Sequence, residues 1–351
     1  MKKLFTLMMV LAMAMALLVG CGQDAATDPA DDGQETTQTG DLQKIVFAEP
    51  IRGYHWAPAY LAQSLGYFAE EGLEAEFMTV KGGNPASAMF AGEAQFTLAG
   101  VEMGLASREA GQNARILLSP TQKYPYQLIG GTADYATMES LRGGVIAGGQ
   151  GALSAPAAFA KACIMASGMT PDVDVSVISM SSPAYPAAIA NGEIQAAIAT
   201  NPWAGKQLID NGGVVIVDGT DAATIEKMIG SAEYELFAIV TTQEYIDANG
   251  ETVQKAVNAM VKALAWMKDA SAEEIAQQLL PLFGDAEEEL LYDAQYDKDR
   301  QIANYTGYHT EKGYAAALAL EKLAGGITQD YPDADIYDES FLDNAWASLD
   351  G

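Results

Sequence analysis

The chain has 351 residues and a formal net charge of −28, with 47 acidic side chains against 19 basic ones. This charge argues against strongly anionic partners, so we expect the folded part to bind no nucleic acid and no anionic lipid surface. Hydrophobic residues make up 49% of the sequence, which is ordinary for a packed globular protein and excludes a mostly disordered chain.

The first twenty residues have the pattern of a secretory signal. Lys2 and Lys3 give a positive start, residues 4–19 form an uncharged apolar run, and Gly20 stands directly before Cys21. A transmembrane helix is the less favoured alternative, because the run is short for a span of about 20 residues and polar residues follow at once. The end of the run resembles a bacterial lipobox. Cleavage there would free Cys21 for lipidation, and the protein would be extracytoplasmic and anchored to the cell membrane.

Residues 21–41 are expected to form a disordered tether, with residues 1–20 as the signal peptide. The segment is rich in Asp, Thr and Gln and has almost nothing apolar, so it cannot bury enough surface to offset its ordering entropy. The folded body starts near Leu42 and is long enough for one large or two medium domains. Cys163 is its one remaining thiol once Cys21 carries lipid, so no internal disulfide is possible.

The sequence lacks the motifs of catalysis and of metal binding. His55 and His309 are the two histidines, and neither comes with a metal-ligand spacing, an HExxH motif or a recognisable catalytic partner. Cys163 lies in a predicted helix, where a lone thiol is usually a small buried hydrophobe. We therefore expect a protein that is not an enzyme, with no catalytic residue, no metal and no cofactor.

Strands and helices alternate through the first two-thirds of the body. The first group has strands at 44–48, 73–80, 95–99 and 115–118 and helices at 56–65, 85–91 and 101–110. The second group has strands at 144–147, 173–178, 195–199 and 214–217 and helices at 153–167, 185–190 and 203–210. This alternation predicts mainly parallel sheets that are covered by helices on both faces.

A further apolar strand at 236–240 precedes a tail that looks helical throughout. The tail carries apolar residues at helical spacing in segments 253–268, 272–280, 286–296 and 311–323. We interpret the body as two lobes: residues 42–128 and 236–351 form lobe 1, and residues 129–235 form lobe 2. The chain would cross between them twice, with a hinge at the crossings. Ligands bind beyond the carboxyl ends of strands, which would face one central cleft.

Short motifs at the joins between these elements carry a resemblance to a known family. They are GYFAEEGL at 66–73, GGNP at 82–85, AGEAQF at 91–96, NGEIQAAI at 191–198 and NPW at 201–203. Together they resemble solute-binding proteins of bacterial ABC importers, in the branch that takes thiamine pyrimidine precursors, nitrate and alkanesulfonates. One departure is Gln195, where the family commonly has an acidic residue.

The resemblance covers residues 45–213 well and the tail only in general character. It implies the α/β, two-lobed periplasmic-binding-protein type II fold, with a central ligand cleft and a helical C-terminal tail. It also implies a small-molecule solute and an ABC permease in the membrane as partners, and we expect a monomer.

Loops that leave strand ends supply the candidate ligand-binding residues. They are Glu49, Arg52, Tyr54, Trp56, Asn84, Glu102, Tyr124, Gln150, Ser154, Tyr185 and Trp203. The rings would stack on a planar ligand, while carboxylates or Arg52 would pair with its polar edge. Structural alternatives stay open: Trp56 packs inside the first helix, Asn84 is an ordinary helix cap, and Glu102 complements a helix dipole.

The cleft predicted in this way is aromatic rather than cationic, with Arg52 and Lys81 as its obvious positive charges. This composition favours a planar N-heterocycle, such as a thiamine pyrimidine precursor, over nitrate, an alkanesulfonate or another small anion. Two other functional classes stay open. One is a pyrimidine-converting enzyme of similar fold, and the other is a surface interaction protein or sensor without cargo.

Overall fold

The computed structural model describes residues 42–80, 84–149 and 154–349. Every described residue belongs to one compact unit. The predicted signal peptide, the tether and Cys21 lie outside the described residues, as do Lys81 and Gln150. In the described part of the chain, no helix is long and apolar enough to cross a membrane.

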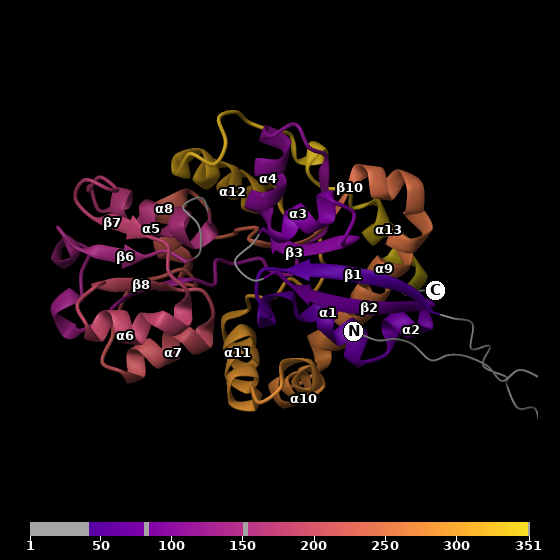
Figure 1. The fold of residues 1–351 in the computed structure, drawn as a ribbon, viewed down its shortest axis with the longest axis horizontal. Coiled ribbons are helices and arrows are strands. Elements are labelled where there is room, and N and C mark those ends of the chain that lie inside the picture. Colours follow the sequence, from indigo (N-terminus) through magenta and orange to yellow (C-terminus); the bar gives the residue numbers. More distant parts are fainter. Residues whose placement is uncertain (1–41, 81–83, 150–153, 350–351) are drawn as a thin grey trace, which may run out of the picture. The chain divides into compact units, whose positions relative to one another are not determined.

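The first sheet has five strands in the order β2-β1-β3-β10-β4 (Figure 1). These strands are β1 (Gln43–Glu49), β2 (Leu73–Thr79), β3 (Phe96–Gly100), β4 (Ala114–Leu118) and β10 (Phe237–Thr242). β1 pairs in parallel with β2 and β3, whereas β10 runs antiparallel between β3 and β4. The strand predicted at 236–240 is thus β10, and it returns the chain to the first sheet.

The second sheet repeats this plan in the order β7-β6-β8-β5-β9. Its strands are β5 (Gln127–Gly130), β6 (Val145–Ala147), β7 (Ser176–Ile178), β8 (Ala196–Ala199) and β9 (Val214–Asp218). β6 pairs in parallel with β7 and β8, and β5 runs antiparallel between β8 and β9. Both sheets are mixed, but in each one four of the five strands run in the same direction, so the prediction of mainly parallel sheets holds and β10 or β5 is the reversed strand. An apolar run reports burial and not strand direction.

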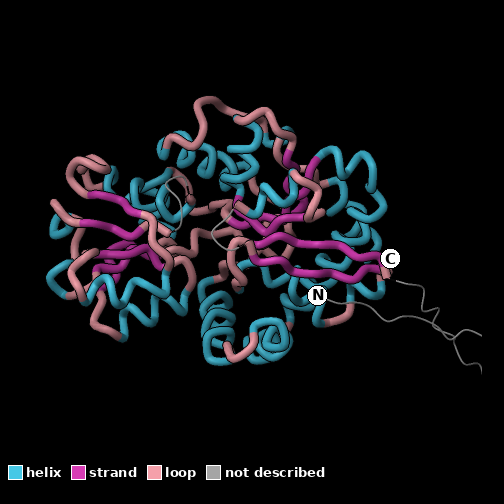
Figure 2. Tube along the Cα trace, viewed as in Figure 1, coloured by secondary structure: helices cyan, strands magenta, loops and turns pink. Residues whose placement is uncertain are grey.

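Helices cover both faces of each sheet (Figure 2). Beside the first sheet are α1 (Ala57–Ser64), α2 (Tyr67–Glu70), α3 (Pro85–Phe90) and α4 (Val101–Glu109). Beside the second are α5 (Ala155–Ala166), α6 (Tyr185–Ala190), α7 (Pro202–Asp210) and α8 (Ala222–Ile229). We call each sheet with these helices a lobe. The chain passes to the second lobe between β4 and β5 and returns between β9 and β10.

The repeated Gly-Glu-Ala-Gln and Gly-Glu-Ile-Gln motifs form the same type of hydrogen bond in both lobes. The side-chain oxygen Oε1 of Gln95 accepts a hydrogen bond from the backbone N–H of Val46 at 2.9 Å. Oε1 of Gln195 accepts one from the N–H of Val145 at 2.8 Å. Each bond satisfies a backbone donor of the neighbouring strand at the point where the helix gives way to the next strand. Gln195, the departure from the family pattern, therefore has a structural role.

The tail is helical, as the sequence predicts. It consists of α9 (Gln243–Asp269), α10 (Ala272–Phe283), α11 (Glu287–Arg300), α12 (Glu311–Ala324) and α13 (Ser340–Leu349). α9 packs on α1, α2, α13 and the first sheet. Two tail helices contact both lobes: α11 touches the 3-10 turn Tyr54–Trp56 and α7, while α12 touches α4, α5 and α8. The tail therefore links the two lobes in addition to the two chain crossings.

Candidate functional site

Three chain segments meet at one edge of the first sheet. The 3-10 turn Tyr54–Trp56 follows the end of β1 and contacts β10. β3 ends at Gly100, which pairs with Phe237 at the start of β10. α4 begins there as well, and the N–H of Val101 donates to the carbonyl of Leu236 at 2.8 Å. The carboxyl ends of β1 and β3 thus meet the second chain crossing, at the edge where α/β proteins bind ligands.

An aromatic cluster fills the space beside this edge. We define it by the rings of His55, Trp56, Tyr124, Tyr126, Phe159, Tyr234 and Phe237. The imidazole of His55 stacks on Phe237 with centroids 4.2 Å apart and planes 6° apart. Trp56 meets the same phenyl ring edge-on at 5.2 Å. These contacts bury apolar area and orient the rings.

The aromatic cluster continues into the second lobe. Tyr126, at the first chain crossing, meets Phe237 edge-on at 6.3 Å and Tyr124 at 5.3 Å. The ring of Tyr124 stacks on the ring of Phe159 in α5, with centroids 4.5 Å apart. Its centroid lies 4.4 Å from that of Tyr234, a residue just before the return crossing. Rings from the first lobe, from α5 and from both crossings are therefore in direct contact. Movement of one lobe against the other would have to shift these contacts.

Contacts within the protein fix the side chains of Trp56 and His55. The indole N–H of Trp56 donates to the carbonyl of Ala99 at 3.0 Å, and the side chain is buried. This favours the structural alternative for Trp56. Burial lowers the pKa of His55 to about 4, and a hydrogen bond with the backbone of Thr200 offsets this only in part. His55 is therefore a neutral ring that bridges the lobes.

Glu102 presents a carboxyl oxygen without a partner. It lies in the first turn of α4, and its buried Oε2 accepts no hydrogen bond within the described ranges. The side chain folds back over Gly100, where an added Cβ would lie only 2.0 Å from Oε2. Burial and the neighbouring Glu321 carboxylate raise the pKa of Glu102 to about 8. At neutral pH the carboxyl group therefore keeps its proton unless a positive charge lies beside it, and a neighbouring cation would favour the carboxylate form.

The side chains of Glu49 and Arg52 pair with each other and with other residues of the first lobe and the tail. The fully buried Glu49 forms an ion pair with Arg52 at 2.9 Å and accepts bonds from Tyr60 at 2.5 Å and Thr79 at 2.6 Å. Arg52 also donates to the carbonyl of Leu282 in α10 at 2.7 Å. These contacts tie β1 to α1, β2 and the tail, so they favour a structural role over the predicted ligand contact.

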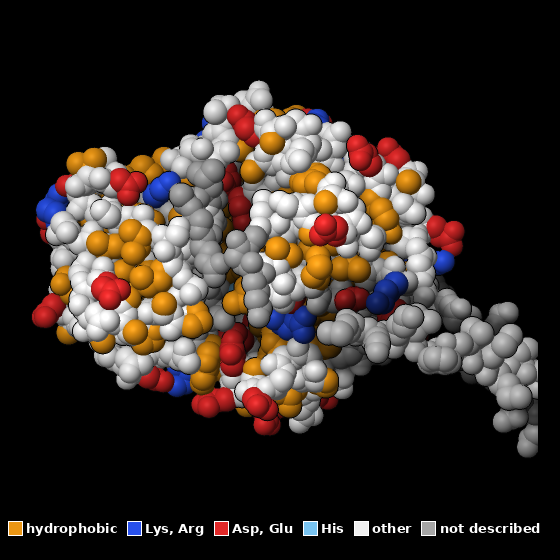
Figure 3. Space-filling view, viewed as in Figure 1, with side chains coloured by type: hydrophobic (Ala, Val, Ile, Leu, Met, Phe, Trp, Pro, Cys, Tyr) orange, Lys and Arg blue, Asp and Glu red, His pale blue; other side chains and the backbone are white. Residues whose placement is uncertain are grey.

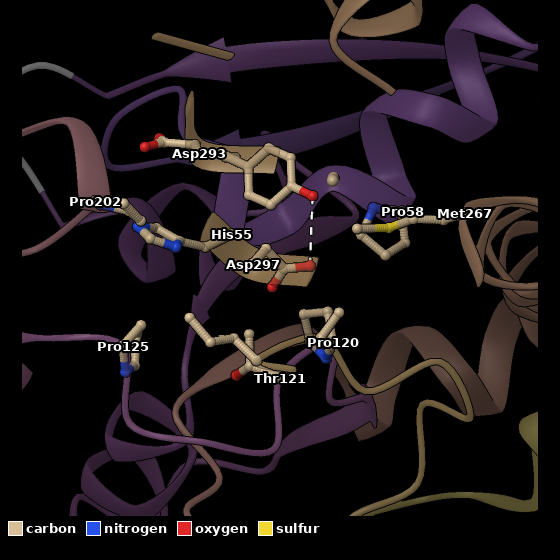
Figure 4. A pocket seen from close by; sticks show the side chains of 13 residues that line it. His55, Pro58, Pro120, Thr121, Pro125, Pro202, Met267, Asp293 and Asp297 are labelled. Carbon is tan, nitrogen blue, oxygen red and sulfur yellow. Dashed lines mark hydrogen bonds between the residues drawn. The ribbon is translucent and has the colours of Figure 1, made fainter. Parts of the chain in front are cut away.

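Tyr54 faces the tail at a small cavity. Its hydroxyl lies 3.5 Å from Oδ2 of Asp297 in α11, as the dashed line in Figure 4 shows. The cavity measures about 20 Å³, room for about one water molecule. His55, Thr121 and Pro202 also line it. Burial raises the pKa of Asp297 to about 7. The cavity is too small for a planar heterocycle, so we do not assign the solute to it.

Trp203 lies at the start of α7, against α11. Its backbone N–H donates to Oδ1 of Asp293 at 2.8 Å, and its ring meets Tyr292 edge-on at 5.9 Å. The ammonium of Lys206 lies 5.5 Å from the centre of the indole ring. In Figure 4 the carboxyl group of Asp293 points away from Asp297. Trp203 thus takes part in a contact between the second lobe and the tail.

Of the other predicted site residues, Tyr124 belongs to the aromatic cluster, and the described ones among the rest make contacts within the protein. Asn84 caps α3, because its Oδ1 accepts from the N–H of Ala86 at 3.0 Å. The hydroxyl of Ser154 donates to the carbonyl of Gly148 at 3.2 Å. Tyr185 is buried in a separate apolar group of the second lobe. Gln150 lies outside the described residues. The ligand-binding role of these residues stays a prediction.

Sequence reasoning missed the contribution of the tail. Glu321 of α12 is 2% exposed and its Oε1 has no partner in the described part of the chain, while Asp293 of α11 is 1% exposed. Phe237 and Tyr234 were also not singled out, although both stand beside the predicted second crossing. Their position next to the crossing was the one signal that could have found them. No set of three His, Cys, Asp or Glu side chains that could hold a metal ion occurs in ranges 42–80, 84–149 and 154–349.

Residues 54–274 match the family model described as NMT1/THI5 like. The chain belongs to this family. The matched segment contains both chain crossings, the second sheet and all seven rings of the aromatic cluster. The resemblance that the join motifs predicted is confirmed at the level of the family.

Known relatives of this NMT1/THI5-like chain include binding proteins. YtlA of Bacillus subtilis (strain 168), named as a binding protein, is 24% identical over 260 residues, which is 72% of this chain and 75% of YtlA. The periplasmic nitrate-binding protein NrtA from Synechocystis PCC 6803 superposes with a TM-score of 0.67 at 14% identity, covering 88% of this chain and 89% of NrtA. These superpositions show a shared fold.

Two further solved structures of similar fold are a binding protein and an enzyme. The periplasmic sulfonate-binding protein SsuA from Methylobacillus flagellatus KT has a TM-score of 0.64 at 14% identity, with 88% of this chain and 96% of SsuA covered. The desulfurization enzyme DSZB has a TM-score of 0.60 at 15% identity, with 88% and 99% covered. The two-lobed fold is thus confirmed, and it is one that serves binding proteins as well as an enzyme.

Proposed function

We propose that this protein is the solute-binding receptor of an ABC importer, which captures a small molecule between two lobes and delivers it to a membrane permease. The aromatic cluster is the observation that carries the proposal, because it joins rings of both lobes and of both crossings at a ligand-binding sheet edge. A solute that contacts both lobes stabilises the closed arrangement through contacts that the open one lacks. The binding-protein names of YtlA, SsuA and NrtA support this function.

The solute that best fits the site is a planar N-heterocycle, such as a thiamine pyrimidine precursor. Flat rings stack on Tyr, Trp and Phe side chains, and the unpartnered oxygen of Glu102 suits the N–H of an amino group or a protonated ring. The alternative is nitrate, an alkanesulfonate or another small anion, which the names of SsuA and NrtA favour. Against it, Arg52 is already paired with Glu49, and the carboxyl group of Glu102 lies near enough to influence the pKa of Tyr126, which burial raises first.

Transport fits the chemistry of the described residues better than catalysis does. His55 is neutral and packed between rings, so it is a poor proton carrier near neutral pH. Burial raises the pKa of the Cys163 thiol, which leaves little thiolate for nucleophilic attack. His309 is held by Glu339 at 2.8 Å and Asp333 at 3.2 Å, away from the aromatic cluster. DSZB shows that an enzyme can have a similar fold. None of these three side chains, however, is an activated proton carrier or nucleophile at the aromatic cluster.

We also propose that the protein works outside the cytoplasmic membrane, held there by lipid on Cys21, as a monomer whose lobes comprise residues 42–128 with 236–351 and residues 129–235. The signal-like start and the polar segment behind it support the anchor. Two or more acyl chains on one cysteine would give stable attachment, whereas a single chain is marginal.

A thermal-shift screen tests the receptor function. The panel contains pyrimidines, alkanesulfonates, nitrate and organic amines, and specific binding raises the melting temperature because the solute binds the native state and not the unfolded chain. A compound that shifts the melting temperature should also reduce the radius of gyration in small-angle scattering as the lobes close. A panel without any hit, combined with turnover of a pyrimidine, would replace the receptor by the enzyme alternative.

A further inference from the structure

Two carboxyl groups with oxygens unpartnered in the described ranges come from α4 and α12, helices that contact each other. Glu102 begins α4 in the first lobe, and Glu321 stands in α12, the tail helix that contacts both lobes. Each has one buried oxygen without a partner among the described residues, Oε2 in Glu102 and Oε1 in Glu321. The Glu321 side chain is 2% exposed. In the space-filling view, acidic side chains lie in the groove that separates the lobes (Figure 3).

The two carboxyl groups act on each other and on the same rings. The Glu321 carboxylate helps to raise the pKa of Glu102, after burial as the larger cause. After burial, the largest influence on the pKa of Tyr126 is Glu102, and on that of Tyr234 it is Glu321, with Glu102 next. Glu321 also acts on the pKa of Tyr124. The carboxyl groups therefore lie within electrostatic range of each other and of the aromatic cluster.

Burial raises the pKa of Glu102 to about 8 and the pKa of Glu321 to about 7, so a positive charge beside them is needed to ionise both near neutral pH. Lys161 of α5 offsets part of the rise for Glu321, and its ammonium also donates to the carbonyl of Ala324 at 3.3 Å. It brings one positive charge to a place with two carboxyl groups. Burying an unpaired carboxylate is costly, and the cost falls when a cation pairs with it. The faces of Tyr, Trp and Phe rings attract cations as well.

We propose that the solute is an organic cation, an amidinium, a protonated aminoheterocycle or a related nitrogen cation, with Glu102 of the first lobe and Glu321 of the tail as its counter-ions. This deepens the proposed receptor function and rests on it. Rings of the aromatic cluster stack on the flat face of the cation. The N–H groups of the cation donate hydrogen bonds to the two unpartnered carboxyl oxygens. Because the counter-ions come from the first lobe and from a helix that also touches the second, binding would strengthen the link between the lobes.

Three probes of equal shape and different charge test this proposal at about pH 7: benzamidine, a cation; benzamide, neutral; and benzoate, an anion. Titration calorimetry should show benzamidine binding at least about tenfold more tightly than benzamide, as expected for one added ion pair and cation–π contact, with benzoate the weakest. Glu102→Gln should remove most of this preference. Gly100→Ala should reduce it too, because the added methyl group displaces the Glu102 carboxylate while every charge is kept.

Glu93→Gln is the matched control. It removes an exposed carboxylate in the turn before β3 and should leave the preference unchanged. Benzamide or benzoate binding as tightly as benzamidine would overturn the cation proposal, and so would the absence of benzamidine binding. If the thermal-shift screen then finds a sulfonate or nitrate, the receptor function stands without the cation. If that screen finds nothing, both proposals fail.

Discussion

The backbone N–H of Trp203 donates to the carboxylate of Asp293 at 2.8 Å, and this bond joins the second lobe to the tail. Trp203 is in the first turn of α7, where N–H groups lack partners within the helix. Asn201 caps one of them, the N–H of Ala204, at 2.7 Å. Asp293, which belongs to α11, satisfies another. The start of α7 is therefore completed by a residue 90 positions further along the chain.

Removing this carboxyl group should weaken the link between lobe and tail. Asp293→Ala leaves the Trp203 N–H without its acceptor, at a cost of about 1–3 kcal/mol, whereas Asp293→Asn keeps an oxygen that can accept. Denaturant unfolding should therefore rank the alanine variant well below the asparagine variant. Small-angle scattering should show a larger radius of gyration for Asp293→Ala without solute. Equal stability of both variants would mean that the bond does not hold the lobe to the tail.

The order of the elements and the shared direction of most strands were predictable from the sequence, and the two reversed strands, β5 and β10, were not. Apolar runs bounded by glycine mark burial and turns, so the return strand 236–240 was found from its run of five apolar residues. β5 escaped notice because its four residues lie in a segment that was interpreted as a crossing. Strand direction depends on how the crossings place β5 and β10 between other strands, which is a property of the whole chain.

Part of the candidate site was predicted from the sequence, and the acidic residues that were missed lie in the tail. Glu102 and Tyr124 come from loops that leave strands, so the rule for strand ends found them. Glu321 lies in an amphipathic helix, where a charged side chain normally faces solvent, and nothing local shows that this one is buried. Asp293 and Asp297, four residues apart on α11, have the spacing of a polar helix face. Their burial follows only from the packing of α11 between the lobes.

Arg52 should matter for stability more than for recognition. Arg52→Met leaves the buried Glu49 without its counter-ion, which we expect to cost about 3 kcal/mol. Lys44→Met removes the exposed Lys44–Glu76 pair and should leave the free energy of unfolding nearly unchanged, because solvent screens an exposed pair. Chemical denaturation measures both. If Arg52→Met folds with ordinary stability and loses solute affinity, Arg52 contacts the solute, as the sequence analysis predicted.

Cys21→Ser should release the protein from the membrane. Serine has no thiol to carry the lipid, so the variant would lose the acyl chains that hold the protein at the membrane. In cell fractionation, the native protein should sediment with membranes and the variant should not. Labelling with an alkyne fatty acid should mark the native chain alone. Cys163→Ser, which alters the buried thiol, serves as the control and should stay labelled. Labelling of Cys21→Ser would contradict the anchor.

The stability of the solute-free protein should fall as the pH rises through neutrality. Burial raises the pKa of Glu102 to about 8 and the pKa values of Glu321 and Asp297 to about 7, from about 4 in the unfolded chain. The folded state therefore binds more protons than the unfolded one. The resulting stability is complete below about pH 4 and is lost as the pH passes the folded pKa values.

The pH window can be chosen so that His55 does not interfere. Its lowered pKa has the opposite sign and increases stability as the pH rises from about 4 to about 6.5. Between about pH 6.5 and pH 8.5 it is mostly neutral in both states. Denaturation in this window then reports the carboxyl groups together with His309. Burial lowers the pKa of His309, but Glu339 outweighs this effect and the pKa is raised, so His309 has the same sign as the carboxyl groups. We expect a decrease on the order of 2 kcal/mol, which Glu102→Gln should diminish and the exposed Glu93→Gln should not. A stability that is flat or rising across this window would show that the buried carboxyl groups are already paired.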